Sequence, residues 1–245
     1  MSAPVLLVTG AGRGIGAAVA RLAGARGYRV AVNYRQDGEA AAATVAAIRE
    51  AGGEAEAFAA DVGDADAIPA LFDAVTARFG PITDLVNNAG LMGGPTRLVD
   101  LETEELERLF RTNVFGTILC CREAARRMSL SRGGAGGRIV NVSSIAAVNG
   151  SIGERVHYAA SKGAVNSFTI GFSREVARDG IRVNVFSPGL TATELNPPER
   201  IARLGPTVPY GRAGEPDEMA RGILWLLSPE AEYCIGANLT MSGGR

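Results

Sequence analysis

Short apolar runs alternate along the chain with alanine-rich stretches that have the character of helices. The apolar runs predict seven strands, at residues 5–8, 29–34, 55–60, 84–87, 138–142, 181–186 and 237–240. The stretches between them predict helices at residues 15–26, 39–51, 64–79, 102–128, 157–178 and 216–227. Strands that are apolar throughout and separated by helices are typical of a parallel sheet covered on both faces. With right-handed crossovers, the pattern predicts an α/β fold with a Rossmann-type doubly wound parallel sheet.

The alternation continues over residues 1–245 without an internal repeat or an interdomain linker, so we expect a single domain. Residues 188–216 interrupt it, because they contain six of the eleven prolines and little periodicity. In this architecture a long loop after a strand commonly covers a ligand. We therefore predict a substrate lid at about residues 190–212.

Charge and composition exclude several kinds of partner. The chain has 25 basic and 26 acidic side chains, so it lacks the basic excess that a nucleic acid or an anionic membrane would require. One histidine, His157, and three cysteines argue against a metal site and against a Ser-His-Asp hydrolase. The apolar runs are too short to span a membrane, and the cysteines suggest no disulfide framework. We expect a cytoplasmic protein.

The first strand leads into a glycine-rich loop and then a helix. The sequence of the loop is Thr-Gly-Ala-Gly-Arg-Gly-Ile-Gly at residues 9–16. A pyrophosphate binds well at a helix N-terminus, and glycines let the backbone approach it closely. In a chain with 32 glycines among 245 residues the alternative is an ordinary tight turn. The position between strand and helix favours a dinucleotide site, with these candidate residues: Gly10, Arg13, Gly14, Ile15 and Gly16.

The end of the second strand bears on the choice of dinucleotide. An acidic residue here usually selects NAD, whereas an arginine accommodates the 2′-phosphate of NADP. The strand ends at Tyr34 and Arg35, and the first acidic residue, Asp37, comes later in the loop. Arg35 and Arg13 could hold a phosphate between them, although both could instead be solvated surface arginines. We predict that NADP(H) is preferred and that NAD(H) is possible.

Tyr158 and Lys162 are the candidates for proton transfer. They are four residues apart in a predicted helix, which places both side chains on one face. An ammonium near a phenol favours the phenolate and lowers its pKa. Lys162 is the only lysine among the 25 basic residues, so this position keeps an ammonium where the chain otherwise uses arginine. The alternative, an exposed helical pair without function, explains that choice poorly.

These motifs, in this order, resemble the short-chain dehydrogenase/reductase family in its single-domain branch. Besides the glycine loop and the Tyr158/Lys162 pair, the matching features are these: Asp61-Val62, Asn87-Asn88-Ala89-Gly90, Asn113, a serine after the fifth strand, and Pro188-Gly189. The resemblance implies an NADP(H)-dependent oxidoreductase that interconverts a carbonyl and a secondary alcohol. It also implies a small-molecule substrate and a homotetramer.

The resemblance further implies roles for individual residues. Ser144, rather than its neighbour Ser143, binds the substrate oxygen, and Tyr158 donates or removes the proton. Lys162 binds the nicotinamide ribose and tunes Tyr158, while Asn113 holds a water that links Lys162 to solvent. The remaining residues expected to bind the cofactor are Tyr34, Asp61, Val62, Asn88, Ala89, Gly90, Pro188, Gly189 and Thr191, together with Tyr158 itself.

Two other functions remain to be weighed. Nucleotide-sugar epimerases and dehydratases share the tyrosine–lysine pair, but they have a different glycine spacing and a larger C-terminal domain. A non-catalytic dinucleotide sensor would be expected to lack part of the catalytic set. The substrate stays open among keto-sugars, oxoacyl thioesters and other ketones, because loops at residues 91–98, 146–157 and 190–209 would contact it. His157 is predicted to be a pocket-wall or capping residue.

Overall fold

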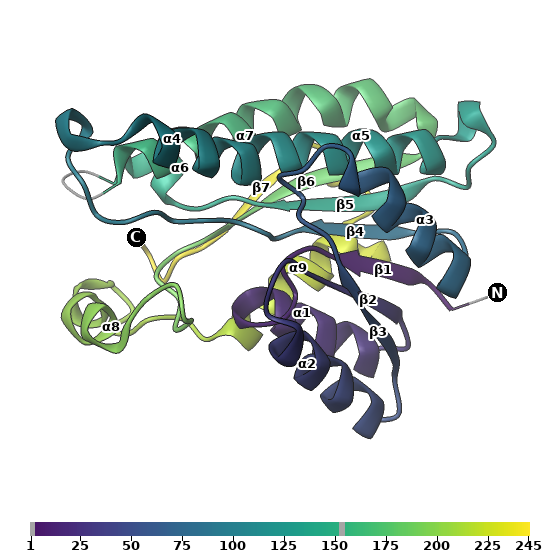
Figure 1. The fold of residues 1–245 in the computed structure, drawn as a ribbon, viewed down its shortest axis with the longest axis horizontal. Coiled ribbons are helices and arrows are strands. Elements are labelled where there is room, and N and C mark those ends of the chain that lie inside the picture. Colours follow the sequence, from purple (N-terminus) through teal and green to yellow (C-terminus); the bar gives the residue numbers. More distant parts are fainter. Residues whose placement is uncertain (1–2, 152–154) are drawn as a thin grey trace.

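A computed structural model describes residues 3–151 and 155–245 of the chain. In this part of the chain seven parallel strands form one sheet, in the order β3-β2-β1-β4-β5-β6-β7 (Figure 1). The strands are β1 (Val5–Val8), β2 (Arg29–Tyr34), β3 (Glu54–Ala59), β4 (Asp84–Asn87), β5 (Gly137–Val142), β6 (Ile181–Pro188) and β7 (Asn238–Met241). The predicted doubly wound Rossmann-type fold is confirmed.

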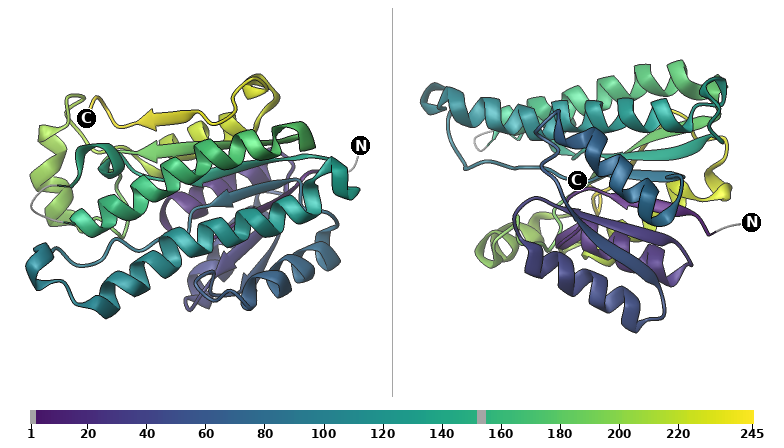
Figure 2. Two further views of the ribbon diagram at one scale, coloured as in Figure 1. Left: turned by 90° about the horizontal axis from the view of Figure 1, so that it is seen from above. Right: turned by 45° about the vertical axis from the view of Figure 1, so that its right-hand side comes forward.

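Helices cover the sheet on both faces (Figures 1 and 2). One layer consists of α1 (Gly14–Ala25), α2 (Gly38–Glu50) and α9 (Pro216–Leu227). The opposite layer contains α3 (Ala67–Phe79), α5 (Thr117–Met128) and α7 (Val156–Val176). Each layer packs a separate hydrophobic cluster against its face of the sheet.

The central strand β1 is apolar throughout because it has helices on both sides. Leu6 and Val8 of β1 pack in the cluster that contains α1 and α9, whereas Val5 and Leu7 pack in the cluster that contains α3 and α5. Successive strand residues point to opposite faces, so a strand between two layers needs apolar residues at every position. All four residues of β1 are buried.

The stretch predicted to be helical at residues 102–128 is helical from Thr103 to Met128, but the helix type changes in the middle. It consists of α4 (Thr103–Phe110), a π-helical turn η2 (Arg111–Gly116) and α5. The side chain of Asn113 in that turn accepts a hydrogen bond from Leu91 N at 2.7 Å and donates one to Leu91 O at 2.8 Å. Such wide turns are frequent at functional sites. This one lies next to the segment that follows β4.

Two short helices fall within segments that were predicted to be loops. They are α6 (Ala146–Asn149) and α8 (Pro198–Leu204). Pro198 occupies the first turn of α8. Proline has no backbone N–H, and in the first turn that group would have no partner within the helix. Periodicity could not reveal α8 because it spans only seven residues.

Brief 3₁₀ turns complete the connections: η1 (Leu98–Asp100), η3 (Leu130–Arg132), η4 (Ala177–Asp179), η5 (Gly205–Thr207) and η6 (Pro229–Ala231). None of the helices described here is long and apolar enough to cross a membrane. Residues 152–154, within one of the segments expected to contact substrate, lie outside the described residues.

Candidate active site

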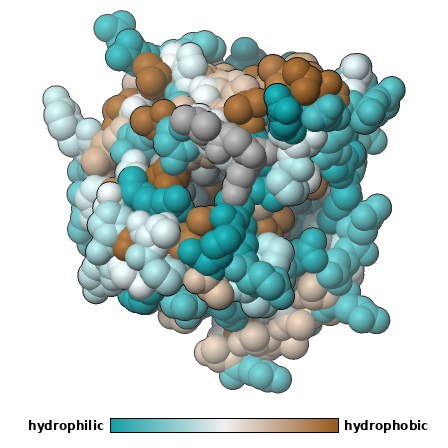
Figure 3. All heavy atoms as spheres, turned by 90° about the vertical axis from the view of Figure 1, so that its left-hand side faces the viewer, coloured by the Kyte–Doolittle hydropathy of each residue, from teal (hydrophilic) through white to brown (hydrophobic). Residues whose placement is uncertain are grey.

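Two adjoining cavities lie at the carboxyl ends of the strands, where the strand order reverses between β1 and β4. Figure 3 shows this side of the molecule, where hydrophilic and hydrophobic residues mix around a hollow. We call them the glycine-loop cavity, of about 420 Å³, and the Tyr158 cavity, of about 430 Å³. Both are lined by Ile15, Asn88, Gly90, Leu91 and Leu195. This switch point is where open α/β sheets bind their ligands.

The glycine loop fits closely against the turn after β4. A Cβ added at Gly10, whose φ is +61°, would lie 2.9 Å from Ala89 Cα. A Cβ at Gly16 would lie 2.5 Å from Asn88 Nδ2. That amide nitrogen donates to Thr9 O and Gly10 O at 3.0 Å each. The close packing requires glycine, and it leaves the N-terminus of α1 beside the cavity, as an anion-binding site needs.

Arg13 and Arg35 both line the glycine-loop cavity. Each lies near a carboxylate: Arg13 Nη1 is 3.8 Å from Asp37 Oδ2, and Arg35 Nη1 is 3.7 Å from Asp61 Oδ2. The four side chains are between 40% and 61% exposed, so these ion pairs contribute little to stability. Both guanidinium groups are therefore available to an anion that offers a better partner.

Most of the predicted site residues line one cavity or both. The glycine-loop cavity is lined by Gly10, Arg13, Gly14, Ile15, Tyr34, Arg35, Asp61, Val62, Asn88, Ala89 and Gly90. The Tyr158 cavity is lined by Ser144, Tyr158, Lys162, Pro188, Gly189 and Thr191, besides the residues the two share. Gly16 and Asn113 line neither cavity within the described part of the chain.

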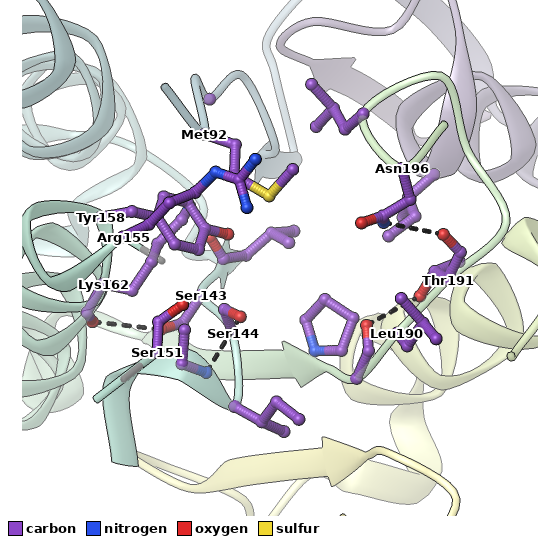
Figure 4. Close-up of a pocket in the computed structure, with 18 of the residues that line it drawn as sticks. Met92, Ser143, Ser144, Ser151, Arg155, Tyr158, Lys162, Leu190, Thr191 and Asn196 are labelled. Carbon is purple, nitrogen blue, oxygen red and sulfur yellow. Dashed lines mark hydrogen bonds between the residues drawn. The ribbon is translucent and has the colours of Figure 1, made fainter. Parts of the chain in front are cut away.

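The side chains of Ser144 and Tyr158 lie near each other in the Tyr158 cavity (Figure 4). The neighbouring Ser143 is buried and donates instead to the carbonyl oxygen of Lys162 at 3.1 Å (Figure 4). The end of β5 therefore presents Ser144, not Ser143, to the tyrosine. Burial raises the pKa of Tyr158, while the nearby Ser144 hydroxyl and the charge of Arg155 lower it. Burial is the largest of these effects, so the phenol is protonated at neutral pH.

Lys162 is almost fully buried, and Nζ donates to Val142 O at 2.9 Å. Burial disfavours its charged form and lowers its pKa to about 8. Nζ lies 5.8 Å from the centre of the Tyr158 ring, on the same face of α7. Lys162 therefore lies next to Tyr158 in the wall of the cavity.

Asn113 is fully buried, and its side chain forms hydrogen bonds with the backbone N–H and carbonyl oxygen of Leu91. It also donates a hydrogen bond to Ser161 Oγ at 3.1 Å. It thereby fixes the segment after β4 next to α7. Gly90 lies between Asn113 and Lys162, since a Cβ there would be 3.4 Å from Asn113 Oδ1 and 3.5 Å from Lys162 Nζ.

His157 has neither of the roles predicted for it. It lines neither cavity in the described structure, and the N-cap of α7 is Arg155. The ring is buried beside Gly93 and Glu105, where a Cβ on Gly93 would be 2.9 Å from His157 Nε2 and 3.0 Å from Glu105 Oε1. Burial lowers the pKa of the imidazole. The direction of the His157 side chain is set by its packing against the segment after β4.

Arg155 is a residue of the Tyr158 cavity that the sequence reasoning missed. Its side chain is buried, and Nε donates to Gly93 O at 3.0 Å. The available signal was an arginine three residues before Tyr158, at the predicted start of the helix. With 24 arginines in the chain, that signal alone did not distinguish it from a surface residue.

Comparison with known proteins agrees with this geometry. The profile of the short chain dehydrogenase family matches residues 4–203. The chain is 45% identical to an uncharacterized oxidoreductase, YgfF, of Escherichia coli K12, over 98% of this chain and 99% of that protein. It is 36% identical to a 3-oxoacyl-[acyl-carrier-protein] reductase of Synechocystis, over 100% of this chain and 97% of that one.

A solved structure provides a similar match. A short chain dehydrogenase from Burkholderia cenocepacia, in complex with NADP, superimposes with a TM-score of 0.88 and 33% identity. The match covers 99% of this chain and 98% of that chain. Similarity of this extent in both sequence and structure means that the chain belongs to the short-chain dehydrogenase family of oxidoreductases.

Proposed function

We propose that this oxidoreductase interconverts a carbonyl and a secondary alcohol with NADP(H), and that Tyr158 is its general acid and base. The observation that carries the proposal is that the Ser144 and Tyr158 side chains line one cavity, which adjoins the glycine loop. Two hydroxyl groups at one point can hold a single substrate oxygen. This is the arrangement that general acid–base catalysis requires.

The chain's residues suit a dinucleotide. The loop at residues 9–16 offers a helix N-terminus that closely packed glycines leave accessible, and Arg13 and Arg35 flank the cavity where a 2′-phosphate would lie. The NADP bound by the Burkholderia relative supports the choice of NADP(H). A nicotinamide bound beside Tyr158 would donate or accept the hydride.

In the proposed reaction Ser144 and Tyr158 donate hydrogen bonds to the carbonyl oxygen. As that oxygen becomes an alkoxide, Tyr158 transfers its proton to it. A protonated tyrosine is the form this step needs, and burial favours that form. Lys162 would bind the ribose hydroxyls and stabilise negative charge on Tyr158, while Asn113 would keep the segment after β4 in place. Assembly as a homotetramer and a cytoplasmic location stay predictions.

Tyr158→Phe tests the proposal, because the substitution removes one hydroxyl and retains the ring. We expect kcat to fall by about 10³-fold, within the range that general acid–base catalysis contributes. The dissociation constant for NADPH should change by less than about threefold, since the phenol contacts the substrate side of the cavity. NADPH consumption would be followed across aldehydes, ketones, keto-sugars and oxoacyl thioesters.

Tyr233→Phe is the matched control, since Tyr233 is fully exposed. It should behave as the unaltered protein in both measurements. Substantial turnover by Tyr158→Phe would contradict the assignment of the acid. The same would follow if NADPH binding were lost along with turnover, because Tyr158 would then act mainly on the cofactor site.

A further inference from the structure

The segment at residues 190–212 contacts the glycine loop through Thr193 and Glu194. A Cβ added at Gly14 would lie 3.3 Å from Thr193 Cγ2 and 3.5 Å from Glu194 Oε2. Gly14 is the first residue of α1, and its φ of +56° is one that favours glycine. Thr193 and Glu194 also line the glycine-loop cavity. The segment that borders the Tyr158 cavity therefore reaches the start of α1 as well.

Hydrogen bonds hold the turn that carries Glu194. Asn196 N donates to Thr193 O at 2.9 Å, and Asn196 Nδ2 donates to Thr191 O at 2.9 Å (Figure 4). Thr191 is buried, and its hydroxyl donates to Gly189 O at 3.1 Å. The turn is therefore anchored to the end of β6, and its backbone sets where the carboxylate lies.

The carboxylate of Glu194 lies beside a helix end that has no acid of its own. The first turn of α1 contains no acidic residue, and its N-cap residue, Arg13, makes no capping hydrogen bond with its side chain. The N–H groups at a helix N-terminus carry partial positive charge and attract anions. The segment at residues 190–212 thus brings an anionic group to the place where the glycine loop attracts one.

The charge of Glu194 is not matched by a cation. The other two carboxylates of the glycine-loop cavity lie next to arginines, since Asp37 is 3.8 Å from Arg13 and Asp61 is 3.7 Å from Arg35. Glu194 is exposed, and it has no ion pair within the described part of the chain. Its negative charge therefore acts on whatever binds at the start of α1.

We propose that Glu194 weakens the binding of the dinucleotide and speeds its release, because its carboxylate faces the pyrophosphate. The inference rests on the proposed function, in which the pyrophosphate lies at the N-terminus of α1, and it adds a residue that limits cofactor affinity. Two negative groups in this position repel each other and compete for the same N–H groups. Release of the cofactor limits turnover in many enzymes, so a residue that hastens it favours a high kcat.

Glu194→Gln tests the inference, because the amide keeps the shape of the side chain and removes its charge. We expect the dissociation constants of NADPH and NADH to fall by the same factor, about fivefold, since both contain the pyrophosphate. Fivefold corresponds to about 1 kcal/mol, the repulsion of two unit charges about 4 Å apart in water. Fluorescence titration measures both constants. The rate of NADPH release, followed by stopped-flow displacement, should fall by a similar factor.

Two further measurements separate repulsion of the pyrophosphate from other effects. Adenosine 2′-monophosphate has the 2′-phosphate but no pyrophosphate, so its dissociation constant should change by less than about twofold. In 1 M salt, where the screening length is about 3 Å, the gain for NADPH should fall below about twofold.

Glu199→Gln is the control. Glu199 is an exposed residue of α8 in the same segment, and it lines neither the glycine-loop cavity nor the Tyr158 cavity in the described structure. The substitution removes the same charge from the same segment, at a distance from α1. It should leave the dissociation constants of all three nucleotides unaltered.

Unchanged or higher dissociation constants for NADPH and NADH in Glu194→Gln would overturn the inference. So would an equal gain for adenosine 2′-monophosphate, because the charge would then act on the 2′-phosphate. Either outcome leaves the proposed function standing, since NADPH still binds. If neither the unaltered protein nor Glu194→Gln binds a dinucleotide, the proposed function fails and the inference fails with it.

Discussion

Lys162 illustrates how a residue that we propose for the site can be costly for the fold. The ammonium is almost fully buried, and its one hydrogen bond to the protein in the described structure goes to Val142 O. Its pKa falls from 10.5 to about 8. Between these two values the folded protein has released the proton and the unfolded chain still binds it. The cost of burial is therefore full below pH 8 and disappears above pH 10.5.

Lys162→Met should stabilise the protein in the absence of cofactor. A shift from 10.5 to about 8 corresponds to about 3 kcal/mol, which is the largest gain expected at pH 7. The gain should shrink as the pH rises from 8 toward 10.5. Urea unfolding at a series of pH values measures it. A variant less stable than the unaltered protein at every pH would show that the ammonium contributes to the fold.

Arg35 is the residue whose removal should separate the two cofactors. We expect Arg35→Ala to weaken the binding of NADPH at least about tenfold and the binding of NADH by less than about threefold. The reason is that only NADPH carries a 2′-phosphate. Fluorescence titration with each dinucleotide gives both dissociation constants. Arg132→Ala, at an exposed position in η3, is the control. Equal losses for both cofactors would refute the contact with the phosphate.

At the scale of the elements, the connection between the glycine loop and the turn after β4 is decisive. Asn88 donates two hydrogen bonds to the loop, and the backbone N–H groups of Asn88 and Ala89 both donate to Thr9 Oγ1 at 3.0 Å. The end of β1 and the end of β4 are thereby joined where the two cavities meet. The start of α1 is held in one position relative to the turn after β4.

Gly16→Ala should break this connection. The new methyl group would lie 2.5 Å from Asn88 Nδ2 and 2.6 Å from Gly10 O, so one of them must move. Overpacking of this kind costs about 1–3 kcal/mol, measurable by urea unfolding. Gly171→Ala in α7 has no neighbour within 4 Å and should instead stabilise by about 0.5–1 kcal/mol. Equal effects of the two substitutions would contradict the close approach.

At the scale of the molecule, the segment at residues 190–212 is a small unit beside the Tyr158 cavity. Leu190, Val208 and Ala213 form their own apolar cluster, with Ile201 and Leu204 packed against it. Backbone bonds from Ala192 N to Gly214 O and from Gly214 N to Leu190 O, 2.9 Å each, join its two ends. A segment with so small a core is expected to open locally at low cost.

Hydrogen exchange tests whether this segment is a lid. Amides at residues 190–212 should exchange more slowly when NADPH and product are bound, because a ligand in the Tyr158 cavity would contact Leu190, Thr191 and Leu195. Peptides from β5 should show little change, since that strand is already inside the sheet. Unchanged exchange at residues 190–212 with both ligands bound would refute the lid.

The sequence by itself determined the fold and the order of the motifs. The seven predicted runs correspond to the seven strands, because strands between two helical layers are largely apolar on both faces. The glycine loop could be predicted equally well, because its motif is local. It needs only a strand before it, glycines that let the backbone approach a ligand closely, and a helix N-terminus after it. Tyr158 and Lys162 share a face because helical spacing alone places them there.

Only the tertiary structure decided which side chains meet in the cavities. It placed Ser144 beside Tyr158 in one cavity and directed Ser143 to the backbone of α7. It also placed Arg155 in that cavity and packed His157 against Gly93. It also introduced the π-helical turn at Asn113 and the helix α8. Each of these depends on contacts with residues distant in sequence or on segments too short for periodicity to register. The direction of a loop side chain is set by what packs against it.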